Sequence, residues 1–227
     1  MPRIQYLSHS AFQVECGGKR LLIDPFITGN PKAPVSAKSI KPDFILVSHG
    51  HGDHLGDALQ LSKAHGAVIV APFELAMWCA AQGAMVHDMH IGGAWDFDFG
   101  RVKLTIAHHG SAVGPDEQLQ YTGSPCGFLV TSEGKTLYHS GDTGLFYDMK
   151  LIGEMNTIDL ALLPIGDNYT MGIVDAIKAV EFLRPKQVVP MHYNTFDPIK
   201  TDPAAFAKGA DKFSRTTVLN IGDWLEY

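Results

Sequence analysis

The sequence predicts an α/β fold built from two βα-rich halves that pack sheet against sheet. Short apolar runs typical of buried strands alternate with amphipathic segments of helical length. Residues 43–61 and 159–180 both run from an acid through five mostly apolar residues into a glycine-rich polar loop and then a helix, which indicates an old duplication. With 45% hydrophobic residues, the 227-residue chain can bury a sizeable core, so we expect a single domain over residues 1–227.

Turn and cap signals divide the first half into strands and helices. A "CGGK" turn separates two strand-like runs. Pro72 stands at the first turn of a helical segment and Gly83 follows its last turn, as is common at helix ends. In chain order, we predict strands at 3–7, 12–16, 20–24, 44–48 and 67–71, and helices at 55–66 and 72–83.

The second half is divided on the same grounds. Residues 94–111 and 126–142 are rich in strand-forming runs, with "SEGK" as a turn inside the latter. Residues 158–193 are typical of a strand, a loop, a helix and a strand in succession. Loops that follow the strands of both halves can then meet at one edge, where α/β folds place functional groups.

Charge and composition argue against several classes of partner. The net charge is −6 and no Lys/Arg run occurs, so we expect neither nucleic acid nor a membrane surface as a partner. The N-terminus lacks the pattern of a signal peptide, and no apolar run approaches the roughly 18 residues of a membrane span. Cys16, Cys79 and Cys126 are scattered and suggest no disulfide framework. We therefore expect a cytoplasmic protein.

One short stretch, "SHGHGDHLGD" at Ser48–Asp57, concentrates metal-ligating side chains. The imidazoles of His49 and His51 can converge on one cation, because the intervening glycine tolerates unusual backbone angles. Asp53 and His54 follow at once but project elsewhere. Four ligand groups this close together suit two ions about 3.5–4 Å apart better than one open ion.

Three further ligand-type residues follow strand-like apolar runs elsewhere in the chain. They are His109 in "TIAHHGS", Asp142 in "YHSGDTG" and His192 in "VVPMHYN". Each is followed by glycine or polar residues, which places it in a loop at a strand end. The pattern predicts that these residues complete the metal site.

Together these motifs resemble the signature of the metallo-β-lactamase-fold hydrolases: HxHxDH, a later His, Gly-Asp-Thr and a final His. "HSAF", "IDPFITGN", "HHGSA", "LPIGDNYTMG" and "PMHYNTF" are also similar to a widespread prokaryotic family of small metal-dependent hydrolases, itself similar to the ascorbate-phosphate lactonases. The matches run from Ser8 to Phe196. The resemblance implies a four-layer αβ/βα sandwich with hydrolytic activity.

The resemblance also implies which residues bind each ion. His109 rather than His108 is the expected ligand, because the family's histidine directly precedes Gly-Ser or Ser-Ser. Each ion keeps a position for a shared water or hydroxide. The implied ligands are His49, His51 and His109 for the first ion, Asp53, His54 and His192 for the second, and Asp142 as a bridge between both.

The donor atoms narrow the choice of metal and substrate. Nitrogen and oxygen donors without a thiolate suit Zn²⁺ first, and also Mn²⁺ or Fe²⁺. The β-lactamases proper often carry Cys in place of Asp142, which argues against an antibiotic substrate. Two divalent ions, two carboxylates and one hydroxide leave a charge of roughly +1, which favours an anionic or strongly polarised small-molecule substrate.

One acid and one histidine near the metal motif need a role. Asp24 is expected to orient a ligand histidine or the metal loop, with a simple turn acid before a proline as the alternative. His9 is a catalytic candidate beside Asp53 and Asp142, with a hydrogen bond inside the sheet as its alternative role.

Other polar residues are weighed between the pocket and the scaffold. His139 lies within a strand and is expected to be structural. A structural role is also expected for His87 and His90, with His90 the better pocket candidate of the two. Residues of the loop that mirrors the metal motif, and residues just past His192, are expected to border the cleft, with loop-stabilising hydrogen bonds as the alternative. The substrate-contact candidates are Asp167, Asn168, Tyr169, Asn194 and Thr195.

From these residues we predict a dinuclear metal-dependent hydrolase that uses a metal-bridging hydroxide on a small ester, lactone or phosphate-containing metabolite. The alternatives are a metal-dependent phosphodiesterase or nuclease, an iron-dependent oxidoreductase of the same fold, and a non-enzymatic metal-binding role. The sequence leaves open the substrate, the native metal and the oligomeric state, a homo-oligomer included.

Overall fold

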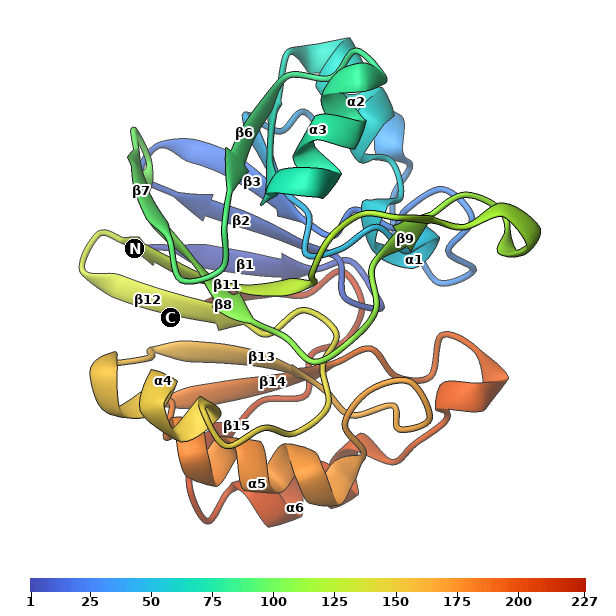
Figure 1. The fold of residues 1–227 in the computed structure, drawn as a ribbon. Helices are drawn as coiled ribbons and strands as arrows, with labels where there is room; N and C mark the ends of the chain where they lie inside the picture. Colours follow the sequence, from blue (N-terminus) through green and yellow to red (C-terminus); the bar gives the residue numbers. More distant parts are fainter.

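The computed structural model, which describes residues 1–227, contains two seven-stranded sheets that face each other, with helices on both outer faces (Figure 1). This arrangement confirms the predicted α/β fold. From one side to the other, the layers are helices, sheet, sheet and helices. None of the helices has the length and apolar character needed to cross a membrane.

The first sheet has the strand order β16-β1-β2-β3-β4-β5-β6. Its first strands form an antiparallel meander, and the strands from β3 to β6 run parallel. Helices α2 (Ala58–His65) and α3 (Phe73–Ala81) cover its outer face (Figure 1). The strands are β1 (Arg3–Tyr6), β2 (Phe12–Cys16), β3 (Lys19–Ile23), β4 (Phe44–Leu46), β5 (Val68–Pro72), β6 (Val86–Met89) and β16 (Trp224–Glu226).

The second sheet has the order β15-β14-β13-β12-β11-β8-β7. Here β7 to β12 pair antiparallel, and β12 to β15 run parallel. The strands are β7 (Ala94–Phe97), β8 (Gly100–Ile106), β11 (Cys126–Ser132), β12 (Lys135–His139), β13 (Leu160–Pro164), β14 (Gln187–Met191) and β15 (Arg215–Thr216), and the covering helices are α4 (Met149–Met155), α5 (Ile173–Leu183) and α6 (Pro203–Ala210).

The two halves repeat one pattern, as the similarity of 43–61 and 159–180 indicates. In each half an antiparallel hairpin is followed by parallel strands, β3-β4-β5 in the first and β12-β13-β14 in the second. The carboxyl ends of parallel strands lie at the same edge of a sheet. The loops that carry the predicted ligands therefore emerge together.

The number of buried residues in a strand depends on whether one or both faces of the strand are covered. In β2, Phe12 and Val14 point into the core while the residues between them are half-buried, as expected of a strand with one covered face. All five residues of β13 are buried because helices pack on one side and the other sheet on the other. Between the sheets lies a core of 22 buried residues drawn from both halves.

The structure also contains elements that the sequence patterns did not predict. These are short or weakly patterned: β6, β16, α4, α6 and a small hairpin of β9 (Ala112–Val113) and β10 (Gln120–Tyr121) that projects from the body (Figure 1). The helix predicted at 55–66 begins only at Ala58. Gly56 breaks it, because its φ of 41° is left-handed and a Cβ there would collide with the Pro25 carbonyl.

A buried carboxylate, that of Asp159, forms hydrogen bonds at the amino-terminal ends of the parallel strands β12, β13 and β14. Asp159 accepts hydrogen bonds from Lys186 Nζ at 2.8 Å, from the Thr136 N–H at 2.9 Å and from Lys135 Nζ at 3.3 Å. Burial by itself would raise the pKa of Asp159, but the bonds from Lys186, Thr136 and Lys135 outweigh it and lower that pKa. Because the folded state favours the ionised form, this stabilisation is present above the ordinary carboxyl pKa and is lost as the pH falls below it.

We therefore expect Asp159→Asn to lower the free energy of unfolding by about 1–2 kcal/mol at pH 7. The difference from the wild type should shrink as the pH falls below about 4. Urea unfolding at pH 7 and pH 3.5 measures both. Asp197→Asn, which removes an exposed partner of Lys200, is the control and should change little. A difference for Asp159→Asn that grows at low pH would contradict the expectation.

Candidate metal centre

The turn after β4 brings two imidazoles together edge to face, with their ring centroids 4.6 Å apart. His49 Nε2 lies 3.0 Å from His51 Nδ1, and Gly50 lies between the two residues. Any Cβ on Gly50 would lie 2.9 Å from the Ala112 carbonyl oxygen, so only glycine fits there. The His109 ring, from the loop after β8, has its centroid 5.0 Å from the His49 ring and 5.1 Å from the His51 ring. The ligand atoms of the three residues all lie within 4.8 Å of one another.

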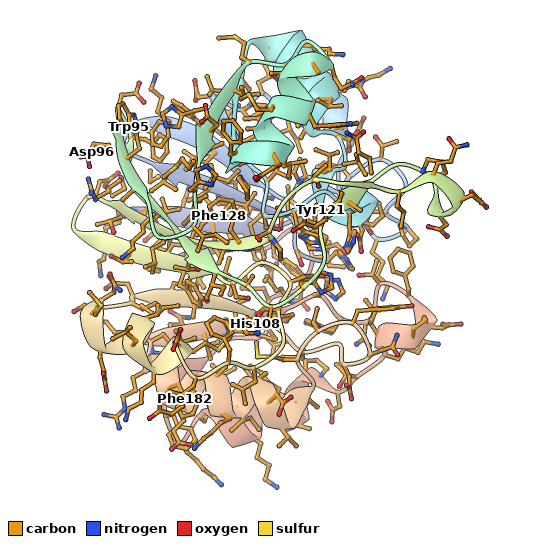
Figure 2. The ribbon with its side chains drawn as sticks, viewed as in Figure 1. Trp95, Asp96, His108, Tyr121, Phe128 and Phe182 are labelled. Carbon is orange, nitrogen blue, oxygen red and sulfur yellow. The ribbon has the colours of Figure 1, made fainter.

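His108, the neighbour of His109, takes a different course. Its exposed ring, labelled in Figure 2, stacks flat on Phe146 in the loop between β12 and α4, with the ring centroids 5.0 Å apart. The geometry thus favours His109 over His108 as the metal ligand.

A second group gathers beside the first. Helix α1 (Gly52–Leu55) carries Asp53 and His54, and the loop after β14 carries His192. Ligand atoms of these three residues, together with one from His9, again lie within 4.8 Å of one another. His192 Nε2 is 3.9 Å from Asp53 Oδ2.

One carboxylate oxygen lies between the two groups. Asp142 Oδ2 is 3.0 Å from His192 Nε2, 3.2 Å from His54 Nε2 and 3.8 Å from His109 Nε2. Asp142 comes from the loop after β12, so the second sheet supplies the link between ligand groups that belong mostly to the first.

The donor atoms fit divalent cations. His54 Nε2 and Asp142 Oδ1 are fully buried and have no hydrogen-bond partner within the protein. Leaving such groups unpaired costs about 1–3 kcal/mol each, so native proteins nearly always satisfy them. Imidazole nitrogens and carboxylate oxygens at this spacing are the donors that Zn²⁺, Mn²⁺ and Fe²⁺ accept.

Asp24 sets the proton positions of two candidate ligands. Its Oδ2 lies 2.8 Å from His54 Nδ1, and it accepts from the Ser48 hydroxyl at 2.7 Å, while Oδ1 accepts from the Ser48 N–H at 2.8 Å. The His54 Nδ1–H therefore donates to Asp24. Burial alone would lower the pKa of His54, but Asp142, Asp24 and Asp53 outweigh it and raise that pKa well above its usual range, so Nε2 would give up its proton only when a metal binds. Because the Ser48 hydroxyl donates to Asp24, it accepts from His49 Nδ1 at 2.9 Å, which leaves the lone pair of His49 on Nε2.

The expected positioning role of Asp24 agrees with this geometry. The sequence interpretation did not single out Ser48, although its place directly before His49 was a usable signal.

His9 joins the site from the turn after β1. Burial lowers the pKa of His9 to about 4, so the ring is neutral at pH 7 and carries one proton. The ionised Asp53 accepts that proton, with His9 Nε2 at 3.1 Å from Asp53 Oδ2, and His9 Nδ1 accepts from Thr195 Oγ1 at 3.0 Å. The His9 ring also packs against His192 at a centroid distance of 4.0 Å. His9 thus lies beneath the site and holds Asp53.

The protonation states suit a metal centre. Burial lowers the pKa values of His49, His51 and His109, so their nitrogens keep lone pairs at neutral pH. Burial alone would raise the pKa of Asp142, but His192 and His54 outweigh it and hold that pKa well below the usual range. Burial alone would also raise the pKa of Asp53, but His54 and His9 outweigh it and lower that pKa.

The substrate-contact candidates fall into two sets. Tyr169 is 58% exposed at the tip of its loop, next to Asn168. Asp167 instead accepts from the Asn168 N–H at 2.9 Å and lies against Gly172 at the start of α5. Asn194 exchanges two hydrogen bonds with the Thr201 main chain, at 2.8 and 3.0 Å. The side chains of Asp167 and Asn194 are thus engaged in loop structure, and contact with substrate stays a prediction for all five candidates, Thr195 included.

His139 and His90 lie outside the cluster. His139 is buried, its Nε2 donates to the Ser10 carbonyl at 3.0 Å and its Nδ1 accepts from the Gly141 N–H at 3.1 Å, which agrees with the expected structural role. His90 stacks on Phe73 at the start of α3, with the centroids 5.4 Å apart.

Comparison with known proteins places the chain in a family. A model described as "Beta-lactamase superfamily domain" matches residues 3–192. The chain belongs to this superfamily. It is 54% identical over 227 residues to a UPF0173 metal-dependent hydrolase of Desulforamulus reducens, with 99% of each chain covered. A UPF0173 metal-dependent hydrolase of Bacillus thuringiensis is 56% identical over 208 residues, which cover 91% of this chain and 92% of that protein.

A solved structure supports the same placement. Igni18, a metallo hydrolase from the archaeon Ignicoccus hospitalis, matches with a TM-score of 0.90 and 38% identity, over 100% of this chain and 99% of Igni18. The predicted resemblance to metallo-β-lactamase-fold hydrolases is confirmed, and the chain is a metal-dependent hydrolase of that superfamily. The narrower likeness to ascorbate-phosphate lactonases stays a prediction.

Proposed function

We propose that the chain is a dinuclear hydrolase that opens a small ester or lactone, with phosphate-containing metabolites as the next class to test. His49, His51 and His109 would hold the first ion, Asp53, His54 and His192 would hold the second, and Asp142 would be shared by both. The observation that carries this proposal is the position of Asp142 Oδ2, within 3.0–3.8 Å of imidazoles from both groups.

The bound ions would supply a nucleophilic hydroxide at neutral pH and stabilise the oxyanion that forms on attack. The protein's own residues do the rest. Asp53 is ionised, its side chain is 34% exposed, and His9 holds one of its oxygens. This would leave the carboxylate of Asp53 placed to take the remaining proton of the hydroxide after it has added to the carbonyl, and to pass that proton to the leaving alkoxide.

Hydrogen bonds to Asp24 and Ser48 hold two of the ligand histidines in place. Asp24 and Ser48 lock His54 and His49 through their second ring nitrogens, so the donor atoms cannot turn away from the site. Because Zn²⁺ accepts this mixed donor set and needs no redox partner, we propose zinc as the native metal.

Metal analysis combined with hydrolysis assays tests the proposal. Protein purified without added metal should contain about two divalent ions per chain. Removal of the ions with dipicolinate should abolish hydrolysis of a panel of lactones and esters, and added Zn²⁺ or Mn²⁺ should restore it. Activity that persists in the metal-free protein, or binding of a single ion, would overturn the dinuclear proposal. Predominantly iron would favour the oxidoreductase alternative.

A further inference from the structure

Two phenylalanines flank His9 at the metal centre, and we name this pair, Phe26 and Phe196, the aromatic wall. The His9 ring lies 5.7 Å from the Phe26 ring and 5.8 Å from the Phe196 ring, measured between centroids. The two phenylalanine rings are 6.2 Å apart. His9 in turn contacts Asp53, so a single residue separates the wall from a proposed ligand of the second ion.

The loop that carries Phe196 is firmly closed. The Asn194 N–H donates to the Ile199 carbonyl at 2.9 Å, and the Asn194 side chain bonds the Thr201 main chain on both sides. The Ile199 N–H donates back to the Phe196 carbonyl at 3.2 Å. These bonds explain why the side chain of Asn194 is occupied inside the loop, since it holds the loop that presents Phe196.

Phe26 is fixed just as closely from the other sheet. Its N–H donates to the Asp24 carbonyl at 2.7 Å, and its own carbonyl accepts from Asn30 Nδ2 at 3.0 Å. Gly56 lies against its backbone, where a Cβ would be 2.8 Å from the Phe26 Cα. The wall is therefore preorganised, so a ligand that packs on it loses little conformational entropy in ordering it.

The wall exposes apolar surface where a polar site would be expected. Phe196 is 41% exposed although its loop is tightly bonded, and Phe26 is half-buried. No Lys or Arg forms an ion pair with Asp24, Asp53 or Asp142, whose basic neighbours are all histidines. Apart from bound ions, this side of the centre offers apolar contact rather than a fixed cation.

We infer that the aromatic wall is a subsite for an apolar substituent of the substrate, an alkyl chain or an aryl ring attached to the ester or lactone. The inference rests on the proposed function and refines it. The positive metal centre attracts the polarised carbonyl that is attacked, whereas the wall selects what that carbonyl carries. Substrates with a hydrophobic tail are thus preferred over small, fully polar ones.

A pair of metal-binding probes tests the wall without requiring turnover. Acetohydroxamate and benzohydroxamate share one chelating head and differ only in a methyl or a phenyl tail. Calorimetry on the zinc-loaded protein should give a Kd for benzohydroxamate about tenfold lower than that for acetohydroxamate, the range that a hydrophobic contact of this size supplies. Hydrolysis of γ-nonalactone and γ-butyrolactone is then compared on the same preparation.

Variants of the wall locate the preference. Phe196→Ala and Phe26→Ala should each reduce the ratio of the two Kd values by about threefold or more, with acetohydroxamate binding and zinc content nearly unchanged. Phe196→Leu, which keeps an apolar side chain, should retain part of the preference. Phe213→Ala is the matched control, because Phe213 is 42% exposed in a different loop after α6.

The outcomes separate the inference from the proposed function. Equal Kd values for the two hydroxamates, or a ratio that neither wall variant changes, would overturn the wall even if lactones are hydrolysed. A strong preference for the phenyl tail that is lost in the wall variants would support the wall. If no lactone or ester is hydrolysed at the same time, that absence of hydrolysis would count against the proposed function and not against the wall.

Discussion

Replacing Asp142 by alanine is expected to remove at least one metal ion per chain and to lower hydrolysis by roughly 10³-fold or more. Asp142 is the residue whose carboxylate lies within 3.8 Å of imidazoles from both ligand groups. Without it, His54 and His192 would face one another without the carboxylate between them, and the two proposed ions would lose their common ligand. Metal content by mass spectrometry and initial rates on the best lactone measure both effects.

Two further variants make the Asp142 result interpretable. Asp142→Asn keeps the shape of the side chain and removes its charge, and it should also lose metal. Asp148→Ala changes an exposed aspartate at the start of α4 and should leave both metal content and rate unchanged. Full metal content in Asp142→Ala, with the fold intact by circular dichroism, would show that the ions are held elsewhere or do not share a ligand.

Asp24→Asn should be the most damaging substitution outside the ligand set. We expect it to weaken metal binding by about 10–100-fold and to lower the free energy of unfolding of the metal-free protein by about 3–5 kcal/mol. Asp24 is fully buried and accepts one hydrogen bond from His54 and two from Ser48. The NH₂ group of an asparagine in its place would face one of these N–H or O–H groups and could not accept its hydrogen bond. Chelator competition and urea unfolding of the stripped protein measure the two effects separately.

A second buried aspartate in the same region serves as the control. Asp57 accepts from the main-chain N–H groups of Ile27 at 3.2 Å and Thr28 at 2.7 Å and contacts no candidate ligand. Asp57→Asn should therefore cost stability while metal affinity stays near the wild-type value. If both variants lose affinity equally, Asp24 acts through general loop stability rather than through His54 and Ser48.

Much of the site follows from local sequence. The spacing of His49, His51, Asp53 and His54 confines four donors to one turn and one helical turn, whatever the rest of the fold does. The resemblance to the metallo-β-lactamase signature then indicated His109 in place of His108, and the geometry favours the same choice.

Features that depend on contacts between distant residues were harder to predict. The role of His9 was open because its partners, Asp53 and Thr195, are 44 and 186 residues away in the chain. The aromatic wall was not predicted at all, since a phenylalanine in a loop carries no sign of which site it will face. The likeness between the two glycine-rich loops suggested Asp167 for substrate contact, yet its carboxylate lies at the start of α5.

By itself, the sequence determined the order of the longer strands and helices, the repeated pattern of the two halves and the chemical identity of the donors, because these depend on periodicity and on neighbours within a few residues. Only the tertiary structure decided that Asp142 stands between two imidazole groups, that Asp24 and Ser48 set the proton positions of the histidines, and that Phe26 and Phe196 flank the centre. The reason is physical: these contacts join loops that are distant in the sequence. Those of Asp142 and of the two phenylalanines also join opposite sheets, so their geometry exists only once the core between the sheets has packed.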